Sequence, residues 1–280
     1  MKIAFTGING FVGQNLKRNL SSHTIIGIKR GISGDELVKT LEGVDIVINL
    51  AGSPIIARWS EDYKKILYKS RIETTKNLVE AFSKLSKKPS LFISTSAVGI
   101  YDNKNIYSEY DKNYGDDFLA NLCKDWENSA IEARNYNIRS VIFRFGIVLG
   151  RDGGALQKML TPFKLGVGGC IGDGKQKFSF IHIDDLINAF IYAIDNPIDG
   201  IFNLTAPTPT TNFGLTKALG KSLHRPTIFN IPQFVLNLIF SEGAKVLTDG
   251  QAVIPKRLLD SGFKFKYKTV EEVIENLING

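Results

Sequence analysis

Short runs of apolar and β-branched residues recur along the first half of the chain and alternate with stretches of helical periodicity. Continuous apolar runs are typical of strands buried on both faces of a parallel sheet. Apolar residues three and four positions apart mark one face of a helix. We expect strands at 2–6, 24–29, 45–50, 91–95 and 140–144, and helices at 11–20, 34–41, 60–85 and 117–136. This order predicts an α/β fold of the Rossmann type, a doubly wound parallel sheet with right-handed crossovers.

The pattern becomes less regular after residue 150, where glycines gather at 166–174 and prolines interrupt 207–232. We expect two more strands at 178–183 and 201–204 around a helix at 184–194, then three or four short helices. The predicted domains are 1–165, with 178–205 returning to the same sheet, and a smaller, mostly helical substrate region at 166–280.

Composition narrows the class of protein. In the 280 residues, 43% hydrophobic and 22% charged side chains indicate a folded core and exclude disorder. Two cysteines without CxxC spacing favour a reducing, cytoplasmic compartment, and three scattered histidines predict no metal site. No signal peptide or membrane span is expected. The charge of +7 is spread along the chain, which predicts no nucleic-acid partner and suits an anionic small ligand.

The segment TGINGFVG at 6–13 joins the first expected strand to the first helix. Its glycines permit a tight turn, a close approach of the backbone to a pyrophosphate, and close packing of helix on strand. The start of the helix then offers free N–H groups to the phosphates. The expected cofactor-binding residues here are Thr6, Gly7, Gly10, Phe11, Val12 and Gly13.

The second strand is expected to end at Ile28-Lys29-Arg30. Folds that prefer NAD usually carry an acidic residue at this strand end, where it holds the ribose 2′-hydroxyl. An ammonium and a guanidinium would instead form charge-assisted bonds with a 2′-phosphate. Lys29 and Arg30 therefore predict NADP(H) as the cofactor, the alternative being a solvated basic strand end.

Two further strand ends carry candidate residues. Leu50, Ala51 and Gly52 follow the third strand and would give a ribose or adenine close access to the backbone, unless they form only a tight turn. Ser94-Thr95-Ser96 ends the next strand, where hydroxyls could reach a substrate carbonyl or hydroxyl. Simple capping by these hydroxyls is the alternative.

These motifs, with others, resemble those of a known family. The chain is similar to extended-type short-chain dehydrogenases/reductases of the NAD(P)-dependent epimerase/dehydratase group, and more narrowly to its atypical "epimerase family protein" subgroup, sometimes labelled cell-division-inhibitor-like. The resemblance spans nearly the whole chain. It is carried by NLAGSPI at 49–55, SRIETT at 70–75, STSAVGIY at 94–101, RFGIVLGRDGGALQKM at 144–159, GDGKQKFSFIHIDDL at 172–186 and GQAVIPKRLLDSGFKF at 250–265.

The resemblance implies an NADP-type cofactor lying across the strand ends. It implies that Arg30 lies near the 2′-phosphate and that Arg71 lies near the cofactor or the site. It also implies that Ile147 and Val148 border the nicotinamide end.

The chain departs from the family in its proton-transfer residues. Active members use a Tyr and a Lys four residues apart, so that the ammonium lowers the pKa of the phenol. None of the nine tyrosines has Lys at that spacing, and Leu119 and Cys123 stand at the matching positions. Ser96 matches the family's site serine. The candidate proton donors are Tyr101, Glu109 and Cys123, each of which could equally have a packing or structural role.

Two functions remain open at this point. One is an oxidoreductase or epimerase-like enzyme that uses NADP(H) on a small carbonyl or sugar-like substrate. The other is a regulatory protein that binds NADP without turning it over, which the missing Tyr/Lys pair would explain. Either protein could be a monomer or a homodimer.

Overall fold

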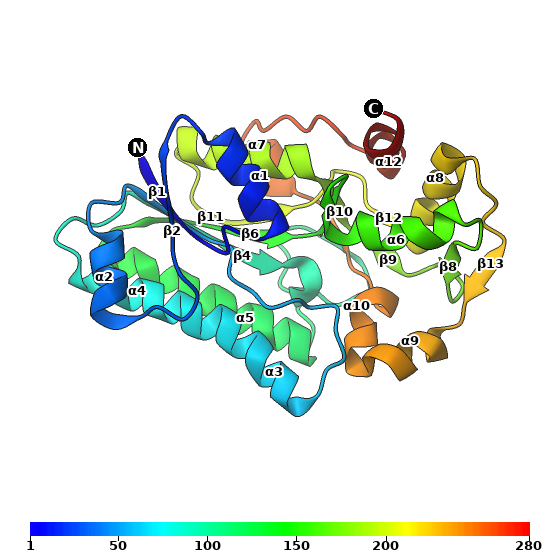
Figure 1. Ribbon diagram of the computed structural model, residues 1–280, viewed down its shortest axis with the longest axis horizontal. Helices are drawn as coiled ribbons and strands as arrows, with labels where there is room; N and C mark the ends of the chain where they lie inside the picture. Colours follow the sequence, from blue (N-terminus) through cyan, green and yellow to red (C-terminus); the bar gives the residue numbers. More distant parts are fainter.

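Six parallel strands form the central sheet of the computed structural model, which describes residues 1–280 (Figure 1). Their order across the sheet places β1 between β2 and β3, so the chain winds outward in both directions from this point, as the predicted doubly wound fold requires. The strands, in sheet order, are β11 (Gly200–Leu204), β6 (Arg139–Phe145), β4 (Leu91–Ala97), β3 (Ile46–Asn49), β1 (Lys2–Thr6) and β2 (Thr24–Gly27).

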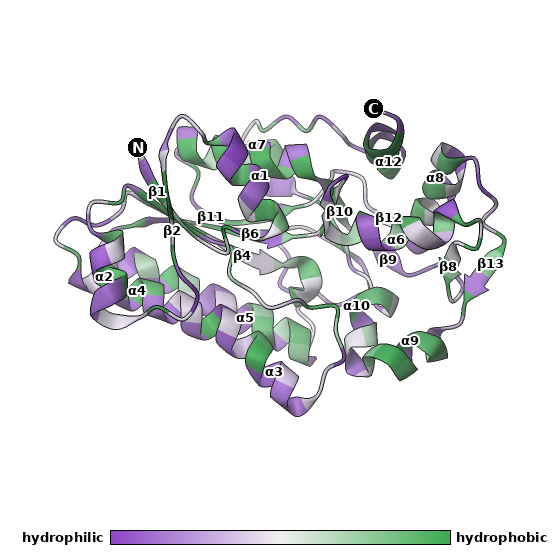
Figure 2. Cartoon of the chain, viewed as in Figure 1, coloured by the Kyte–Doolittle hydropathy of each residue, from purple (hydrophilic) through white to green (hydrophobic).

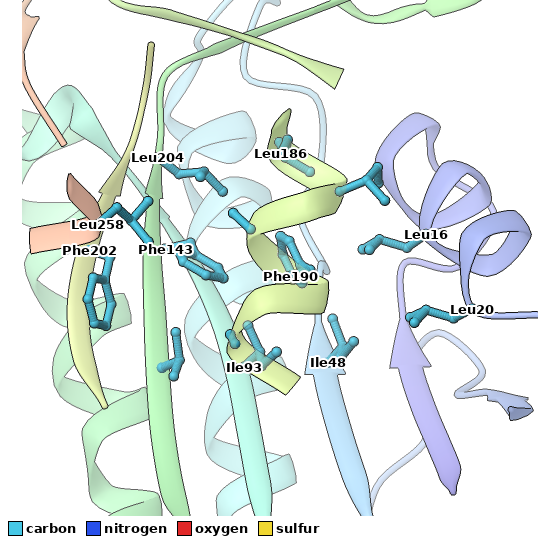
Figure 3. Packing of buried hydrophobic residues seen from close by; sticks show 14 of the residues in the cluster. Leu16, Leu20, Ile48, Ile93, Phe143, Leu186, Phe190, Phe202, Leu204 and Leu258 are labelled. Carbon is cyan, nitrogen blue, oxygen red and sulfur yellow. The ribbon is translucent and has the colours of Figure 1, made fainter. Parts of the chain in front are cut away.

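Helices cover both faces of this sheet. On one face lie α1 (Phe11–Asn19) and α7 (Ile183–Asp195), and on the other lie α2 (Gly34–Leu41), α4 (Thr74–Lys84) and α5 (Phe118–Ile131) (Figure 1). A cluster of 22 buried apolar residues fills the first interface and one of 16 fills the second. Figure 3 shows the first cluster, in which Phe190 of α7 packs onto Phe143 of β6 with ring centroids 5.0 Å apart.

Three expected elements differ from the structure. The strand expected at 178–183 is divided into β9 (Lys177–Phe178) and β10 (Phe180–His182), and neither joins the central sheet. The helical stretch at 60–85 is divided into α3 (Glu61–Tyr68), a π-helical turn (Lys69–Glu73) and α4, because one turn holds an additional residue. The second strand ends at Gly27, not at residue 29. Ile28 still donates its N–H to the Phe5 carbonyl (2.7 Å), but Lys29 and Arg30 lie in the following loop.

The second half of the chain adds α6 (Gly154–Lys164) and five helices after β11, not three or four. A separate cluster of 14 buried apolar residues joins α6, α8 and α12. The division of the chain at residues 165 and 166 stays a prediction. The late helices are α8 (Asn212–Leu223), α9 (Gln233–Phe240), α10 (Lys245–Thr248), α11 (Lys256–Asp260) and α12 (Val270–Asn279).

Short strand pairs connect these helices. β7 (Ile147–Gly150) pairs with β10 (Phe180–His182), β8 (Gly169–Ile171) with β13 (Phe229–Ile231), β9 (Lys177–Phe178) with β12 (Thr210–Thr211), and β5 (Ile106–Tyr107) with β14 (Ala252–Val253). At the start of α7 the expected cap was Asp184. The structure instead places the ring of His182 there, where Nδ1 accepts the Asp184 N–H (3.0 Å).

Helix α9 is largely hydrophobic, as Figure 2 shows, and none of its residues is buried. Phe234 is 70% exposed and Leu238 is 75% exposed. None of the helices is both long enough and apolar enough to cross a membrane.

Replacing Phe190 with Ala tests the first core cluster. The Phe190 side chain is fully buried, so its removal leaves a cavity between α7 and the sheet. We expect the free energy of unfolding, measured by urea titration, to fall by about 3–5 kcal/mol. Phe213→Ala is the matched control, because Phe213 is 51% exposed and should change stability by less than about 0.5 kcal/mol. Equal losses in the two variants would contradict this packing.

Candidate functional site

A cavity of about 230 Å³ opens at the carboxyl ends of β1, β2 and β3, the edge where doubly wound sheets bind ligands. Polar and small residues from the loops after these strands form much of its wall. Six of the residues expected from the sequence meet here, namely Thr6, Gly7, Lys29, Arg30, Ala51 and Gly52.

The glycine loop has the backbone that its sequence predicts. Gly7 adopts φ +65°, and a Cβ on it would lie 2.7 Å from the Leu50 carbonyl oxygen. A Cβ on Gly13 would lie 2.5 Å from the Gly7 carbonyl oxygen. Any side chain at either position would therefore displace the backbone of the turn. Gly10 caps α1 without a side chain, which leaves the first N–H groups of the helix available to a ligand.

The side chains of Phe11 and Val12 have packing contacts. A Cβ on Gly150, Gly153 or Gly154 would lie within about 3 Å of the Phe11 ring, so these glycines let the loop before α6 rest on that ring. Val12 packs against the first core cluster. The part of these two residues that the motif expects to meet a phosphate is therefore the backbone at the start of α1.

Arg30 and Lys29 contribute positive charge to the cavity and form no ion pair with a carboxylate of the chain. The one side-chain hydrogen bond of Arg30 is a long one, from Nη2 to Ser53 Oγ (3.5 Å). The charges are thus free to meet an anionic ligand.

Ten of the 16 lining residues were missed by the sequence analysis, and the polar ones among them are Ser53, Ser70, Thr74 and Asn77. Ser53 donates its N–H to Ser70 Oγ (3.0 Å), which ties the β3 loop to the π-helical turn. Thr74 and Asn77 are three residues apart on α4 and therefore share a face. That spacing was the available signal, but only the fold shows which face meets the cavity.

Eight of the expected cofactor residues do not line this cavity. Gly10, Phe11, Val12 and Gly13 lie at the start of α1 as described above, and the other four lie elsewhere. Leu50 abuts Gly7 through its carbonyl. Ile147 and Val148 belong to β7, where they pair with β10. Arg71 lies in the π-helical turn and places its guanidinium against Gly52, whose added Cβ would be 3.1 Å from Arg71 Cζ.

Ser96 stands at the end of β4 and is 3% exposed. Its hydroxyl oxygen has no hydrogen-bond partner in the chain. Buried hydroxyls are nearly always paired, so the missing partner of this one marks Ser96 as a candidate for contact with a bound molecule.

Tyr101 and Cys123 are each 1% exposed. Burial raises the pKa of the Tyr101 phenol to about 12, although Arg144 opposes the shift. Burial, and then the charge of Glu127, raise the pKa of the Cys123 thiol to about 12. Both groups hold their protons near neutral pH, so neither is prepared to act as a base there.

A closed ionic network surrounds Tyr101. Arg144, only 1% exposed, donates from Nε and Nη2 to the two carboxylate oxygens of Glu127 (2.7 Å each) and from Nη1 to the Tyr101 hydroxyl (2.6 Å). Burial alone would lower the pKa of Arg144, but the bonds to Glu127 outweigh it and raise that pKa.

The third candidate, Glu109, accepts N–H groups of Asn203 (2.8 Å) and Arg257 (3.2 Å), and burial raises its pKa. These contacts occupy both Tyr101 and Glu109.

The fold and the cavity define the protein as a Rossmann-type dinucleotide-binding protein, and comparisons with known proteins give its family. Residues 3–205 match the NAD dependent epimerase/dehydratase family, and residues 231–277 match a domain of unknown function (DUF1731). The chain therefore belongs to the NAD dependent epimerase/dehydratase family, which confirms the resemblance found in the motifs.

Similar proteins occur in distant organisms. The chain is 37% identical to "Epimerase family protein SA0724" of Staphylococcus aureus (strain N315), over 98% of this chain and 97% of that protein. It is 36% identical to the "Epimerase family protein SDR39U1 homolog, chloroplastic" of Arabidopsis thaliana, over 99% and 87%. The crystal structure of human epimerase family protein SDR39U1 (isoform 2) with NADPH superimposes with a TM-score of 0.92 at 32% identity, covering all of both chains.

The raised pKa of Cys123 predicts a loss of stability in alkali. An unfolded thiol ionises near its ordinary pKa of 9.0, whereas the folded one keeps its proton until about pH 12. The folded state therefore binds more protons between these values, and its stability falls as the pH rises above 9. In urea titrations below pH 8, we expect the free energies of unfolding of Cys123→Ala and the wild type to differ by a constant amount. Between pH 9 and 10.5, the variant should lose less of this free energy than the wild type. Parallel curves over the whole range would contradict the assignment.

Proposed function

We propose that the protein is an NADP(H)-dependent oxidoreductase or epimerase-like enzyme that acts on a small carbonyl or sugar-like substrate. The observation that carries this proposal is the cavity beside the glycine loop. Arg30 and Lys29 line this cavity, and neither is paired with a carboxylate. The human relative solved with NADPH supports the same cofactor.

The residues present fit such a cofactor. Thr6, Gly7, Ala51 and Gly52 give a dinucleotide close access to the backbone, and the free N–H groups at the start of α1 suit its pyrophosphate. Arg30, with Lys29, would bind the 2′-phosphate. We place the nicotinamide end toward Ile147, Val148 and Ser96, as the family resemblance implies. When bound, the cofactor supplies hydride chemistry.

Ser96 is the residue that we propose to hydrogen-bond the substrate. Its buried hydroxyl lacks a partner and lies at the carboxyl edge of the sheet. It could donate to a carbonyl oxygen or accept from a hydroxyl. The proton donor stays unassigned among Tyr101, Cys123 and Glu109.

A regulatory protein that binds NADP(H) without turnover is the second candidate. The missing Tyr/Lys pair favours it, together with the burial of Tyr101 and Cys123 and their raised pKa values. The cytoplasmic location stays a prediction, since the Arabidopsis relative is named as chloroplastic. The choice between monomer and homodimer is likewise open.

Replacing Arg30 with Ala tests the cofactor preference. Loss of charge-assisted bonds to a phosphate typically costs about 1.5–3 kcal/mol, which corresponds to a tenfold or greater loss of affinity. In calorimetric titrations we expect NADPH to bind the variant at least tenfold more weakly, with little change for NADH. Arg18→Ala removes an exposed arginine at the far end of α1 and should leave both affinities unchanged. Equal wild-type affinities for NADPH and NADH would refute the preference.

Cofactor turnover separates the two candidate functions. An enzyme should consume NADPH, followed at 340 nm, with at least one compound from a panel of small aldehydes, ketones and oxo acids. The rate should fall at least tenfold in Ser96→Ala while NADPH affinity is retained. A protein that binds NADPH tightly but consumes none with any compound of the panel would favour the regulatory function.

A further inference from the structure

Arg71 is a partly buried cation for which the chain provides no anion. It forms no ion pair, whereas the fully buried Arg144 has Glu127 as its partner. Burial lowers the pKa of Arg71, but a guanidinium stays charged in proteins. A desolvated charge is costly unless it is paired. The missing partner is therefore a feature that needs an explanation.

The contacts that hold Arg71 leave part of its guanidinium free. Nη2 donates to the Ser53 carbonyl (3.0 Å), and Nη1 makes two long contacts, to the Leu67 carbonyl and to Ser70 Oγ (3.4 Å each). The guanidinium also lies over the Trp126 ring, 5.3 Å from its centroid. A guanidinium has five N–H donors. Nε and one N–H of Nη2 remain without an acceptor.

Two backbone features produce this position. The π-helical turn at Lys69–Glu73 carries Arg71, and such turns are frequent at functional sites. Gly52 then lets the guanidinium approach the main chain after β3, because a Cβ there would be 3.1 Å from both Cζ and Nη2 of Arg71. The chain thus holds this cation in place from two separate segments.

Ser96, whose hydroxyl has no partner in the chain, lies in the same part of the molecule. Cys123 and Trp126 are three residues apart on α5 and therefore lie on one face of that helix. Arg71 lies over Trp126, and Cys123 packs in one cluster with Ala97 and Val98, the two residues that follow Ser96. A free cationic donor and a free hydroxyl thus occur together, an arrangement that suits an oxyanion next to a carbonyl or hydroxyl group.

We propose that Arg71 and Ser96 form a substrate subsite in which Arg71 binds a carboxylate and Ser96 binds the adjacent carbonyl or hydroxyl oxygen. The substrate would then be an acid, of the 2-oxo or 2-hydroxy class. This inference rests on the proposed function, because it concerns the substrate end of the same site.

The strand order argues that this oxyanion belongs to the substrate and not to the cofactor. The phosphates of the cofactor have their own partners at the start of α1 and at Arg30, next to β1 and β2. Ser96 ends β4, two strands away from β1 in the sheet. Neighbouring strands are about 4.8 Å apart, so Ser96 lies about 10 Å from the phosphate partners beside β1.

Oxalate is the probe that tests the subsite, because its two carboxylates imitate a carboxylate beside a carbonyl. In calorimetric titrations we expect oxalate to bind the NADPH-saturated wild-type protein and its neutral analogue oxamide not to bind. The affinity for oxalate should fall at least tenfold in Arg71→Met and about threefold in Ser96→Ala. The affinity for NADPH should change less than twofold in both variants. Arg18→Met, which removes an exposed arginine, should leave oxalate binding unchanged.

Other results would overturn the proposal. It fails if oxalate does not bind the NADPH-loaded wild-type protein, or if Arg71→Met binds oxalate normally. It also fails if Arg71→Met loses NADPH affinity tenfold, because the oxyanion would then be a cofactor phosphate. If circular dichroism shows that Arg71→Met does not fold, Arg71→Lys replaces it in the test. Lysine offers fewer donors in the same place, so the affinity for oxalate should fall. Unchanged affinity would refute the subsite.

The outcome is distinguishable from a failure of the proposed function. If NADPH does not bind the wild-type protein, the proposed function is wrong. Oxalate is then titrated into the protein without cofactor, where binding that is lost in Arg71→Met would still support an anion subsite. Absence of oxalate binding there would overturn the subsite as well.

Discussion

A buried hydrogen bond joins the carboxyl ends of β1 and β3, from the Thr6 hydroxyl to the side-chain oxygen of Asn49 (2.7 Å). Thr6 Oγ1 also accepts the N–H of Ala51 (3.1 Å), and the Asn49 amide donates to Thr75 Oγ1 (2.8 Å), which in turn accepts from Trp126 Nε1 (3.1 Å). Because these polar groups are buried or partly buried, each bond offsets the desolvation cost of the groups that it joins. The chain of bonds therefore fixes the strand ends, α4 and α5 in one arrangement, on which the position of every proposed ligand group depends.

A second polar network lies further along the same sheet edge and is closed to ligands. Arg144 and Glu127 satisfy each other's charges, and Tyr101 is held between Arg144 and the side-chain oxygen of Asn203 (3.1 Å). Breaking such a pair would leave an uncompensated buried charge, so these side chains are retained for structure. Tyr101 is thus held in place by polar neighbours on two sides.

Two cations lie outside that network at the same edge of the sheet. Arg30 lines the cavity beside β1 and β2, and Arg71 lies over Trp126 and against Gly52, at the border of that cavity. Neither has a carboxylate of the chain as a partner, so part of the net charge of +7 is concentrated where ligands would bind. Because the same fold serves many reactions, it is this placement of charges, more than the sheet itself, that bears on the reaction.

The sequence by itself determined the parallel strands, the glycine loop and the basic residues after β2, because these features depend on local apolar runs and on backbone freedom at Gly7 and Gly13. The tertiary structure alone decided that Ser53, Thr74 and Asn77 reach the cavity, since strand ends and a helix face distant in sequence meet only when the sheet forms. It also decided where Arg71 lies, because the π-helical turn adds one residue and so changes the direction in which Arg71 leaves the helix. The state of Cys123 likewise follows from the packing of α5 on β4, for burial and the nearby Glu127 carboxylate are properties of the assembled core.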